Sequence, residues 1–250
     1  MKKIAVVEDN PDNRLLVRVI LEPLYEVTEY ESGFAALDGL ARERPDLVLL
    51  DISLPEMDGT EVLRRLRADA GLKDLPVIAL TAHAMSGDRE KYLGAGFNDY
   101  VTKPIVDETV LLGAIEKLLA GGAAVSAPAA PEPEPVEAGV DRLKRLGGGK
   151  FAAEMIGLFF DYTQTKLAEA RAAFVAGDCA GVARAVHPIK SSAGNVGAAE
   201  MQKLAAQIEE LCKQPLVAGL ARPLGELENA FAEIRPRLEA RKKMFESEGA

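Results

Sequence analysis

The sequence predicts two domains: a (βα)5 doubly wound parallel-sheet α/β domain, followed by an all-α four-helix bundle. Three observations predict this arrangement. The first half alternates short apolar runs with amphipathic segments, the second half contains amphipathic helical segments only, and a stretch rich in alanine and proline separates the two. Each half has about 110 residues or more, which is enough for a hydrophobic core of its own.

The strands of the first domain are predicted from apolar runs without polar alternation, the pattern of strands covered on both faces. These runs are residues 4–7, 26–30, 47–50, 77–80 and 100–101. An amphipathic segment follows each one, at residues 13–21, 34–42, 61–67, 88–93 and 109–119. Strictly alternating strands and helices produce a parallel sheet, and ligands bind such sheets outside the carboxyl ends of the strands. We assign residues 1–120 to this domain.

Residues 121–138 are predicted to form an extended linker. They contain four prolines among alanine and glutamate residues, and proline interrupts both helices and sheets. Residues 139–250 show four amphipathic stripes, the first over residues 150–176, with Gly177 ending that helix and Asp178 capping the next. Short connections between amphipathic helices predict antiparallel neighbours in a bundle.

Composition excludes several classes of protein. A formal net charge of −9 argues against binding nucleic acid or anionic membranes through bulk charge. Cys179 and Cys212 are too few for a disulfide scaffold or a four-thiolate metal site. The apolar run near the start stops at Glu8, too early for a signal peptide, and no run approaches the roughly 18 apolar residues of a membrane span. We expect a cytoplasmic protein without membrane insertion.

Polar side chains stand where the predicted strands end. Glu8 and Asp9 follow the first strand, Asp51 ends the third, Thr81 ends the fourth and Lys103 follows the fifth. In a doubly wound sheet these five side chains meet at one edge. The alternative is that each residue only caps the helix that follows it, which would explain single residues but not all five. Clustered carboxylates require a cation, and oxygen ligands suit Mg²⁺. With a lysine and a hydroxyl beside them, they are suited to phosphoryl transfer.

Four motifs carry a resemblance to a known family. They are V-V-E-D-N at residues 6–10, L-L-D-I-S-L-P-E-M-D-G at 49–59, L-T-A at 80–82 and Y-V-T-K-P at 100–104. With them, residues 1–120 resemble the receiver domain of response regulators. The resemblance implies that Asp51 is the phosphoacceptor and that Glu8, Asp9, Asp51 and the backbone carbonyl of Ser53 bind Mg²⁺.

The same resemblance implies roles for the residues around the phosphoryl group. Thr81 and Lys103 would contact it, and the peptide bond from Lys103 to the following proline would be cis. Tyr100 stands at the position of the aromatic switch of the family. Ser53 and His83 stand at the two flanking positions that tune the lifetime of the phosphoryl group. A receiver domain of this kind catalyses its own phosphorylation and dephosphorylation.

His187 is the only histidine after the linker, and its surroundings distinguish it from an ordinary helix residue. Lys190 follows one turn later on the same helix face, and Ser191 follows at the next position, so that a cation and a hydroxyl could reach a group attached to the imidazole. A neutral imidazole can attack phosphorus. Gly194 and Gly197, both predicted to lie within the same helix, suggest that the backbone of a partner comes close or that helices pack tightly there.

The segment H-P-I-K-S-S-A-G-N-V-G-A at residues 187–198 resembles the histidine phosphotransfer (HPt) domain, a four-helix bundle. The resemblance extends over roughly residues 140–240 and implies that His187 is a phosphoacceptor with Lys190 beside it. Two residues depart from the family pattern. Ser191 stands where glycine is usual, and Pro188 removes a helix amide, from which we expect a local kink.

Together the two halves predict a two-component phosphorelay protein. Asp51 would accept a phosphoryl group from a phosphohistidine, and His187 would shuttle phosphoryl to or from a receiver aspartate. The expected partners are a sensor histidine kinase and other receiver or HPt proteins, and not nucleic acid. No ATP-binding kinase catalytic domain is recognisable in the sequence. Two alternatives stay open: a phosphorylation-controlled switch whose bundle only docks a partner, and a phosphate sink that drains a kinase.

Overall fold

The computed structural model describes residues 1–82, 88–122, 134–213 and 217–248. The chain divides into two compact units, Met1–Pro131 and Glu132–Ala250. His83 and residues 123–133 of the predicted linker lie outside the described residues.

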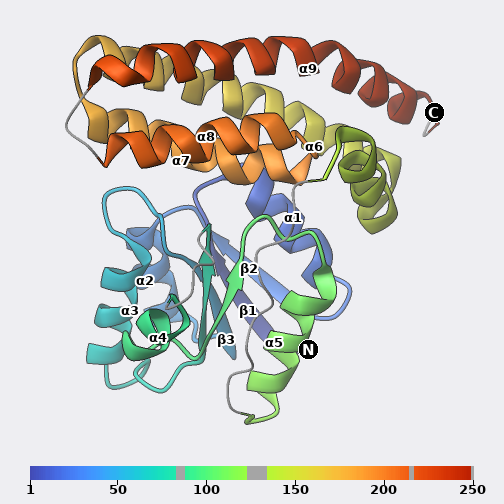
Figure 1. Cartoon of the computed structure of the whole chain (residues 1–250). Helices are drawn as coiled ribbons and strands as arrows, with labels where there is room; N and C mark the ends of the chain where they lie inside the picture. Colours follow the sequence, from blue (N-terminus) through green and yellow to red (C-terminus); the bar gives the residue numbers. More distant parts are fainter. Residues whose placement is uncertain (83–87, 123–133, 214–216, 249–250) are drawn as a thin grey trace. The chain divides into compact units, whose positions relative to one another are not determined.

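The first unit is a five-stranded parallel sheet with the strand order β2-β1-β3-β4-β5. Its strands are β1 (Lys3–Val7), β2 (Glu26–Tyr30), β3 (Leu47–Asp51), β4 (Val77–Thr81) and β5 (Asp99–Thr102). Its helices are α1 (Pro11–Leu21), α2 (Gly33–Arg42), α3 (Gly59–Ala68), α4 (Asp88–Gly94) and α5 (Glu108–Leu119). Helices cover both faces of the sheet (Figure 1). The predicted α/β fold is therefore confirmed.

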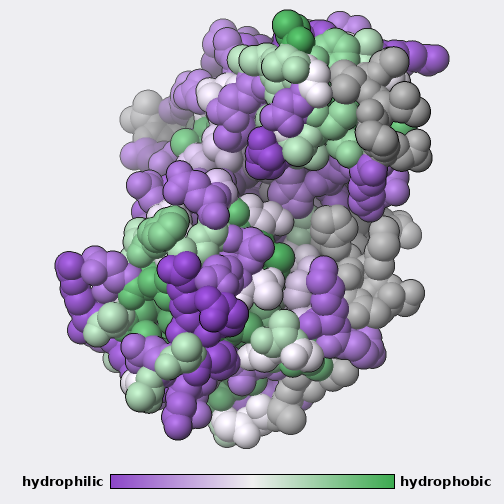
Figure 2. Space-filling view, turned by 90° about the vertical axis from the view of Figure 1, so that its left-hand side faces the viewer, coloured by the Kyte–Doolittle hydropathy of each residue, from purple (hydrophilic) through white to green (hydrophobic). Residues whose placement is uncertain are grey.

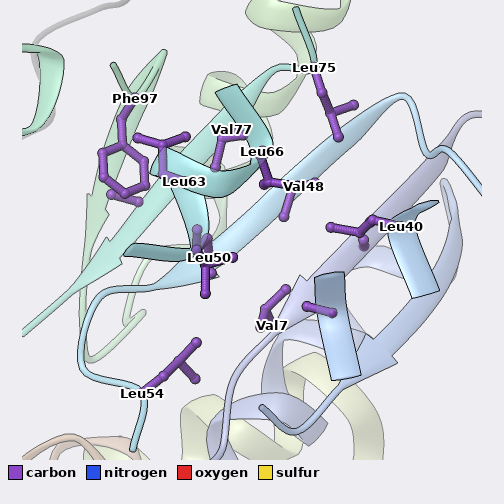
Figure 3. Close-up of a cluster of buried hydrophobic side chains, with 14 of the residues drawn as sticks. Val7, Leu40, Val48, Leu50, Leu54, Leu63, Leu66, Leu75, Val77 and Phe97 are labelled. Carbon is purple, nitrogen blue, oxygen red and sulfur yellow. The ribbon is translucent and has the colours of Figure 1, made fainter. Parts of the chain in front are cut away.

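The core explains why the central strands are continuous apolar runs. β3 and β4 are buried along their whole length, whereas the edge strand β2 is only partly buried. Leu40 of α2 and Leu63 of α3 lie against Val48 and Leu50 of β3 on one face of the sheet (Figure 3). Each fully buried aliphatic side chain contributes about 1.5–3 kcal/mol. The sheet is thus a rigid platform for the loops at its carboxyl edge.

The second unit is a helical bundle, as predicted. Its elements are α6 (Val136–Val175), α7 (Cys179–Asn195), α8 (Ala199–Cys212), the short 3₁₀ helix η1 (Val217–Leu220) and α9 (Ala221–Glu248). α6 packs against α7 and α9, and α8 packs against the same two helices (Figure 1). Each long helix therefore has two neighbours in a closed arrangement of four.

α6 begins earlier than the sequence suggested. It starts at Val136, inside the predicted linker of residues 121–138, instead of at residue 150. Gly148 has φ 82° and ψ 179°, so two helical pieces meet at a kink at this residue. Only glycine adopts such dihedral angles readily, which explains why the kink falls there.

The first piece of α6 pairs with the last turns of α9. Glu137 lies 2.5 Å from Arg237, and Lys144 lies 2.6 Å from Glu248. Asp141 pairs with Arg241 between them. Phe245 is fully buried at this contact. The first piece of α6 and the last turns of α9 thus extend the bundle, and no motif in the sequence indicated this extension.

α7 begins as predicted and ends earlier than predicted. Asp178 caps it by accepting a hydrogen bond from the amide of Gly181. The helix continues unbroken across Pro188, so the proline does not terminate it, and a local bend there stays a prediction. Gly197, predicted within the helix, lies after its end with φ 74°. A Cβ there would stand 2.5 Å from the carbonyl oxygen of Pro135, which supports tight packing at this position; the approach of a partner's backbone stays a prediction.

Hydrophilic residues cover much of the face seen in the space-filling view, with hydrophobic residues in separate groups (Figure 2). Across the part of the chain that the structure describes, no helix combines the length and the apolar character needed to cross a membrane.

Candidate functional site

An acidic cluster forms where β1 and β3, neighbours in the sheet, reach their carboxyl ends. Glu8 follows β1 directly, and Asp51 is the last residue of β3. Oxygen atoms of Glu8, Asp9 and Asp51 all lie within 4.8 Å of one another. Glu8 is 0% exposed and Asp51 is 2% exposed. Parallel topology thus brings Asp51 next to the adjacent pair Glu8 and Asp9, from which it is far apart in sequence.

Lys103 completes this cluster from the end of β5. Its Nζ lies 2.9 Å from Oε2 of Glu8 and 2.7 Å from Oδ2 of Asp51. The peptide bond from Lys103 to Pro104 is cis, as expected. Burial lowers the pKa of the Lys103 ammonium, but the charges of Asp51 and Glu8 outweigh it and hold the pKa above its ordinary value.

Glu8 is fixed by contacts that the sequence did not reveal. Nδ2 of Asn13 donates to Oε1 of Glu8 at 3.2 Å, and the amide of Asn10 donates to the same oxygen at 3.3 Å. Arg14 donates to the backbone carbonyl of Glu8 at 2.6 Å. Asn10 also caps α1 by accepting a hydrogen bond from the amide of Asp12. The cap that starts the helix therefore also holds the carboxylate.

The charge balance of the cluster fits a hard divalent cation. Burial, followed by the charge of Asp51, raises the pKa of Glu8 to about 8, although Lys103 opposes the shift. One ammonium therefore does not fully compensate three carboxylates. All candidate side-chain donors are oxygen atoms, the ligands that Mg²⁺ prefers. The amide of Ser53 donates to Oδ1 of Asp51 at 2.9 Å and orients that carboxylate.

Thr81 ends β4 at the same edge of the sheet, and Tyr100 lies two residues back from that edge in the neighbouring strand β5. Leu80 is the register partner of Asp51, so Thr81 follows at the same edge of the sheet. Thr81 is buried, and its Oγ1 lies 2.8 Å from the hydroxyl oxygen of Tyr92 in α4. Tyr100 in β5 is buried, with its ring centroid 6.1 Å from that of Tyr92.

The second unit presents a half-buried histidine on α7. Nδ1 of His187 makes a hydrogen bond with Oε1 of Glu209 on α8. Nζ of Lys190 lies 3.7 Å from the other carboxylate oxygen of Glu209. Lys190 thus lies near His187, as the helix spacing predicted, and both side chains meet the same carboxylate.

Two details of this site differ from or add to the sequence prediction. The hydroxyl of Ser191 was expected to reach a group on the imidazole, but it is buried and donates to the carbonyl of Pro188 at 3.1 Å. Glu209 was not predicted at all. It adjoins Ile208 in an amphipathic helix that looks ordinary in sequence, and only the packing of α7 against α8 reveals its contact with His187.

Comparisons with known proteins agree with this arrangement. The family model of the response regulator receiver domain matches residues 4–116, and that of the Hpt domain matches residues 154–237. Polar-differentiation response regulator DivK of Brucella anthropi is 48% identical over 106 residues, which cover 42% of this chain and 85% of DivK.

Sensor proteins match across both units. Sensor protein GacS of Pseudomonas syringae pv. syringae is 34% identical over 227 residues, 85% of this chain and 25% of GacS. Sensor histidine kinase GacS of Pseudomonas protegens is 30% identical over 245 residues, 93% of this chain and 26% of that protein. The chain spans about a quarter of the length of these two sensors. It belongs to the response regulator receiver family and joins a receiver domain to an Hpt domain, the composition of a two-component phosphorelay protein.

Proposed function

We propose that Asp51 is the phosphoacceptor of the receiver domain and that Mg²⁺ assists it. Glu8, Asp9, Asp51 and the backbone carbonyl of Ser53 would hold the ion. The observation that carries this proposal is the buried position of Asp51, whose carboxylate contacts Lys103 and lies within 4.8 Å of two further carboxylates. When bound, Mg²⁺ would neutralise phosphoryl oxygens and leave Asp51 able to approach phosphorus.

The chemical step at Asp51 is a direct phosphoryl transfer. A carboxylate oxygen of Asp51 forms a bond to phosphorus as the P–N bond of a phosphohistidine breaks. The electron pair of that bond returns to the imidazole nitrogen, which then takes a proton from solvent. Lys103 would bind one phosphoryl oxygen as the charge redistributes, and Thr81 would donate a hydrogen bond to another. Tyr100 would respond to the movement of Thr81, and the residue types at positions 53 and 83 would tune the lifetime of the phosphoryl group.

His187 would carry phosphoryl in the second unit through its Nε2 atom. A carboxylate only accepts hydrogen bonds, so the contact with Glu209 places the ring hydrogen on Nδ1. The neutral imidazole then has its lone pair on Nε2, which can attack the phosphorus of an aspartyl phosphate. The P–O bond breaks and its electron pair returns to the aspartate. Lys190 would stabilise the transferred group, and Glu209 would act as a positioning residue.

The expected partners follow from this chemistry. A sensor histidine kinase would supply phosphoryl to Asp51, and other receiver or Hpt proteins would exchange it with Asp51 or His187. We assign residues 1–120 to the receiver domain. The phosphotransfer domain would begin with α6 at Val136, three residues before the predicted boundary at residue 139, because that helix packs into the bundle.

Two substitutions test the proposal. The chain would be incubated with a phosphorylated histidine kinase and Mg²⁺, and its label would be separated by chemical stability. Asp51→Asn should abolish the base-labile acyl phosphate, and His187→Gln should abolish the acid-labile, base-stable phosphohistidine. Base-labile label that persists in Asp51→Asn would contradict the role of Asp51. Signalling that survives His187→Gln but not Asp51→Asn would instead indicate a bundle that only docks a partner.

A further inference from the structure

Tyr92 belongs to no motif of the predicted site, yet it contacts a residue of that site. Its hydroxyl oxygen lies 2.8 Å from Oγ1 of Thr81. Tyr92 is 4% exposed and Thr81 is 1% exposed, so the two hydroxyls share a hydrogen bond away from bulk solvent. A buried hydrogen bond of this kind is strengthened by its low-dielectric surroundings.

The ring of Tyr92 is fixed by its neighbours. Phe97 meets it edge to face, with centroids 6.1 Å apart and an interplanar angle of 89°. The ring of Tyr100 lies 6.1 Å away on β5, and the ammonium of Lys91 stands 5.4 Å from the ring centroid. Because packing holds the ring in place, its hydroxyl can direct Thr81 with little loss of side-chain freedom.

The chemistry of the two hydroxyl groups suggests the direction of the hydrogen bond. A hydroxyl has one hydrogen to donate and two lone pairs that accept, and a phenol is the more acidic donor of the two. With Tyr92 as donor, Thr81 accepts through a lone pair and can give its own hydrogen to a phosphoryl oxygen. The contact with Tyr92 then persists during transfer, and successive hydrogen bonds polarise one another.

We propose that Tyr92 is a positioning residue for phosphoryl transfer to Asp51 and that it acts through Thr81. This inference rests on the proposed function, in which Thr81 contacts the phosphoryl group. It adds a residue of α4 to the set that determines the rate of transfer.

A double-mutant cycle in the full chain tests this inference. The rate of Asp51 phosphorylation would be measured with phosphoramidate and Mg²⁺ for the unmodified chain, Tyr92→Phe, Thr81→Ala and the double variant. Tyr92→Phe removes one hydroxyl and keeps the ring, so it should slow phosphorylation about three- to tenfold, the effect of one lost hydrogen bond. The apparent Mg²⁺ affinity should not change. In the Thr81→Ala background, Tyr92→Phe should have no further effect.

A matched control removes the hydroxyl group of a different buried tyrosine. Tyr25 lies next to the start of β2, at the amino edge of the sheet, so Tyr25→Phe should leave the rate unchanged. Thr81→Ser keeps a hydroxyl at position 81, and in that background Tyr92→Phe should again slow phosphorylation. If Tyr92→Phe lowers the melting temperature strongly, a variant with 3,5-difluorotyrosine at position 92 would be used in its place. This variant should change the rate of Asp51 phosphorylation only while residue 81 carries a hydroxyl.

The outcomes separate this inference from the proposed function. If Tyr92→Phe slows phosphorylation equally with and without the Thr81 hydroxyl, the inference is overturned. Faster phosphorylation in Tyr92→Phe would also overturn it, because the hydrogen bond would then restrain Thr81. An unchanged rate in Tyr92→Phe, with slow Thr81→Ala, would overturn the role of Tyr92 and leave that of Thr81 intact. An unchanged rate in Thr81→Ala would overturn the proposed role of Thr81 and the inference with it.

Discussion

Nδ1 of His187 makes its hydrogen bond with the carboxylate of Glu209, on the neighbouring helix of the bundle. Glu209 also attracts Lys190, so one carboxylate organises both residues that the sequence placed at the phosphotransfer site. The orientation of His187 therefore depends on a contact between α7 and α8. This relationship leads to the first of four predictions.

Glu209→Gln should slow phosphoryl transfer to His187 about tenfold. Glutamine keeps an acceptor oxygen for Nδ1 but removes the charge, and charge-assisted hydrogen bonds are about twice as strong as neutral ones. The rate would be measured from a phosphorylated receiver to the chain. Glu210→Gln is the matched control, because Glu210 is exposed and pairs with Lys213. Equal rates for the two variants would contradict the positioning role of Glu209.

Lys103→Met should destabilise the receiver unit in Mg²⁺-free buffer. It leaves the buried carboxylates of Glu8 and Asp51 without their shared ammonium, and breaking a buried ion pair costs about 3–5 kcal/mol. Urea unfolding with and without Mg²⁺ would measure the loss, and Mg²⁺ should stabilise this variant more than the unmodified protein. Lys2→Met, which removes an exposed pair with Asp46, should cost at most about 1 kcal/mol. Similar losses in the two variants would contradict the conclusion that the buried carboxylates depend on the Lys103 ammonium.

Gly197→Ala should destabilise the bundle by at least about 2 kcal/mol. Gly197 has φ 74°, and a Cβ would come within 2.5 Å of the carbonyl oxygen of Pro135. Gly225→Ala provides the opposite case, since Gly225 lies within α9 with open space around it. That substitution should stabilise the helix by about 0.5–1 kcal/mol. Calorimetry of the full chain would compare the stabilities of the two variants. If both stabilities shift in the same direction by a similar amount, the explanation is refuted.

Phe245→Ala should lower the stability of the bundle by about 3–5 kcal/mol. Phe245 of α9 lies beyond residue 237, where the Hpt family match ends, yet it is fully buried beside the first piece of α6. Lys144 and Arg241 also lie near its ring, with cation-to-centroid distances of 5.2 Å and 5.0 Å. The neighbouring Met244 is exposed, so Met244→Ala should have little effect. Thermal unfolding of both variants would show whether the extension is a structural part of the bundle.

Parallel topology explains why so much of the receiver site was predictable. Glu8, Asp51 and Lys103 follow apolar runs, and in a parallel sheet all carboxyl ends lie at one edge. Their convergence thus follows from the order of strands and helices alone. Tyr92 and Asn13 were missed because each contacts the site from a helix, and the sequence does not specify how that helix is rotated against its neighbours.

The start of the bundle was harder to predict, because the local sequence there does not look helical. Val136 follows a proline-rich stretch, and three consecutive glycines at residues 147–149 interrupt the helical pattern. Helix formation before Gly148 depends on packing against α9, because short helical segments gain most of their stability from tertiary contacts.

The sequence by itself determined the α/β and all-α fold classes, the alternation of strands and helices that places the acidic residues at one edge of the sheet, and the position of His187 one helical turn from Lys190. These features depend on periodicity and chain order, which are local. The tertiary structure alone decided that Glu209 meets His187, that Tyr92 meets Thr81, and that the two ends of the bundle pair with each other. Such contacts join elements whose relative rotation is set by side-chain packing, and that packing exists only in the folded chain.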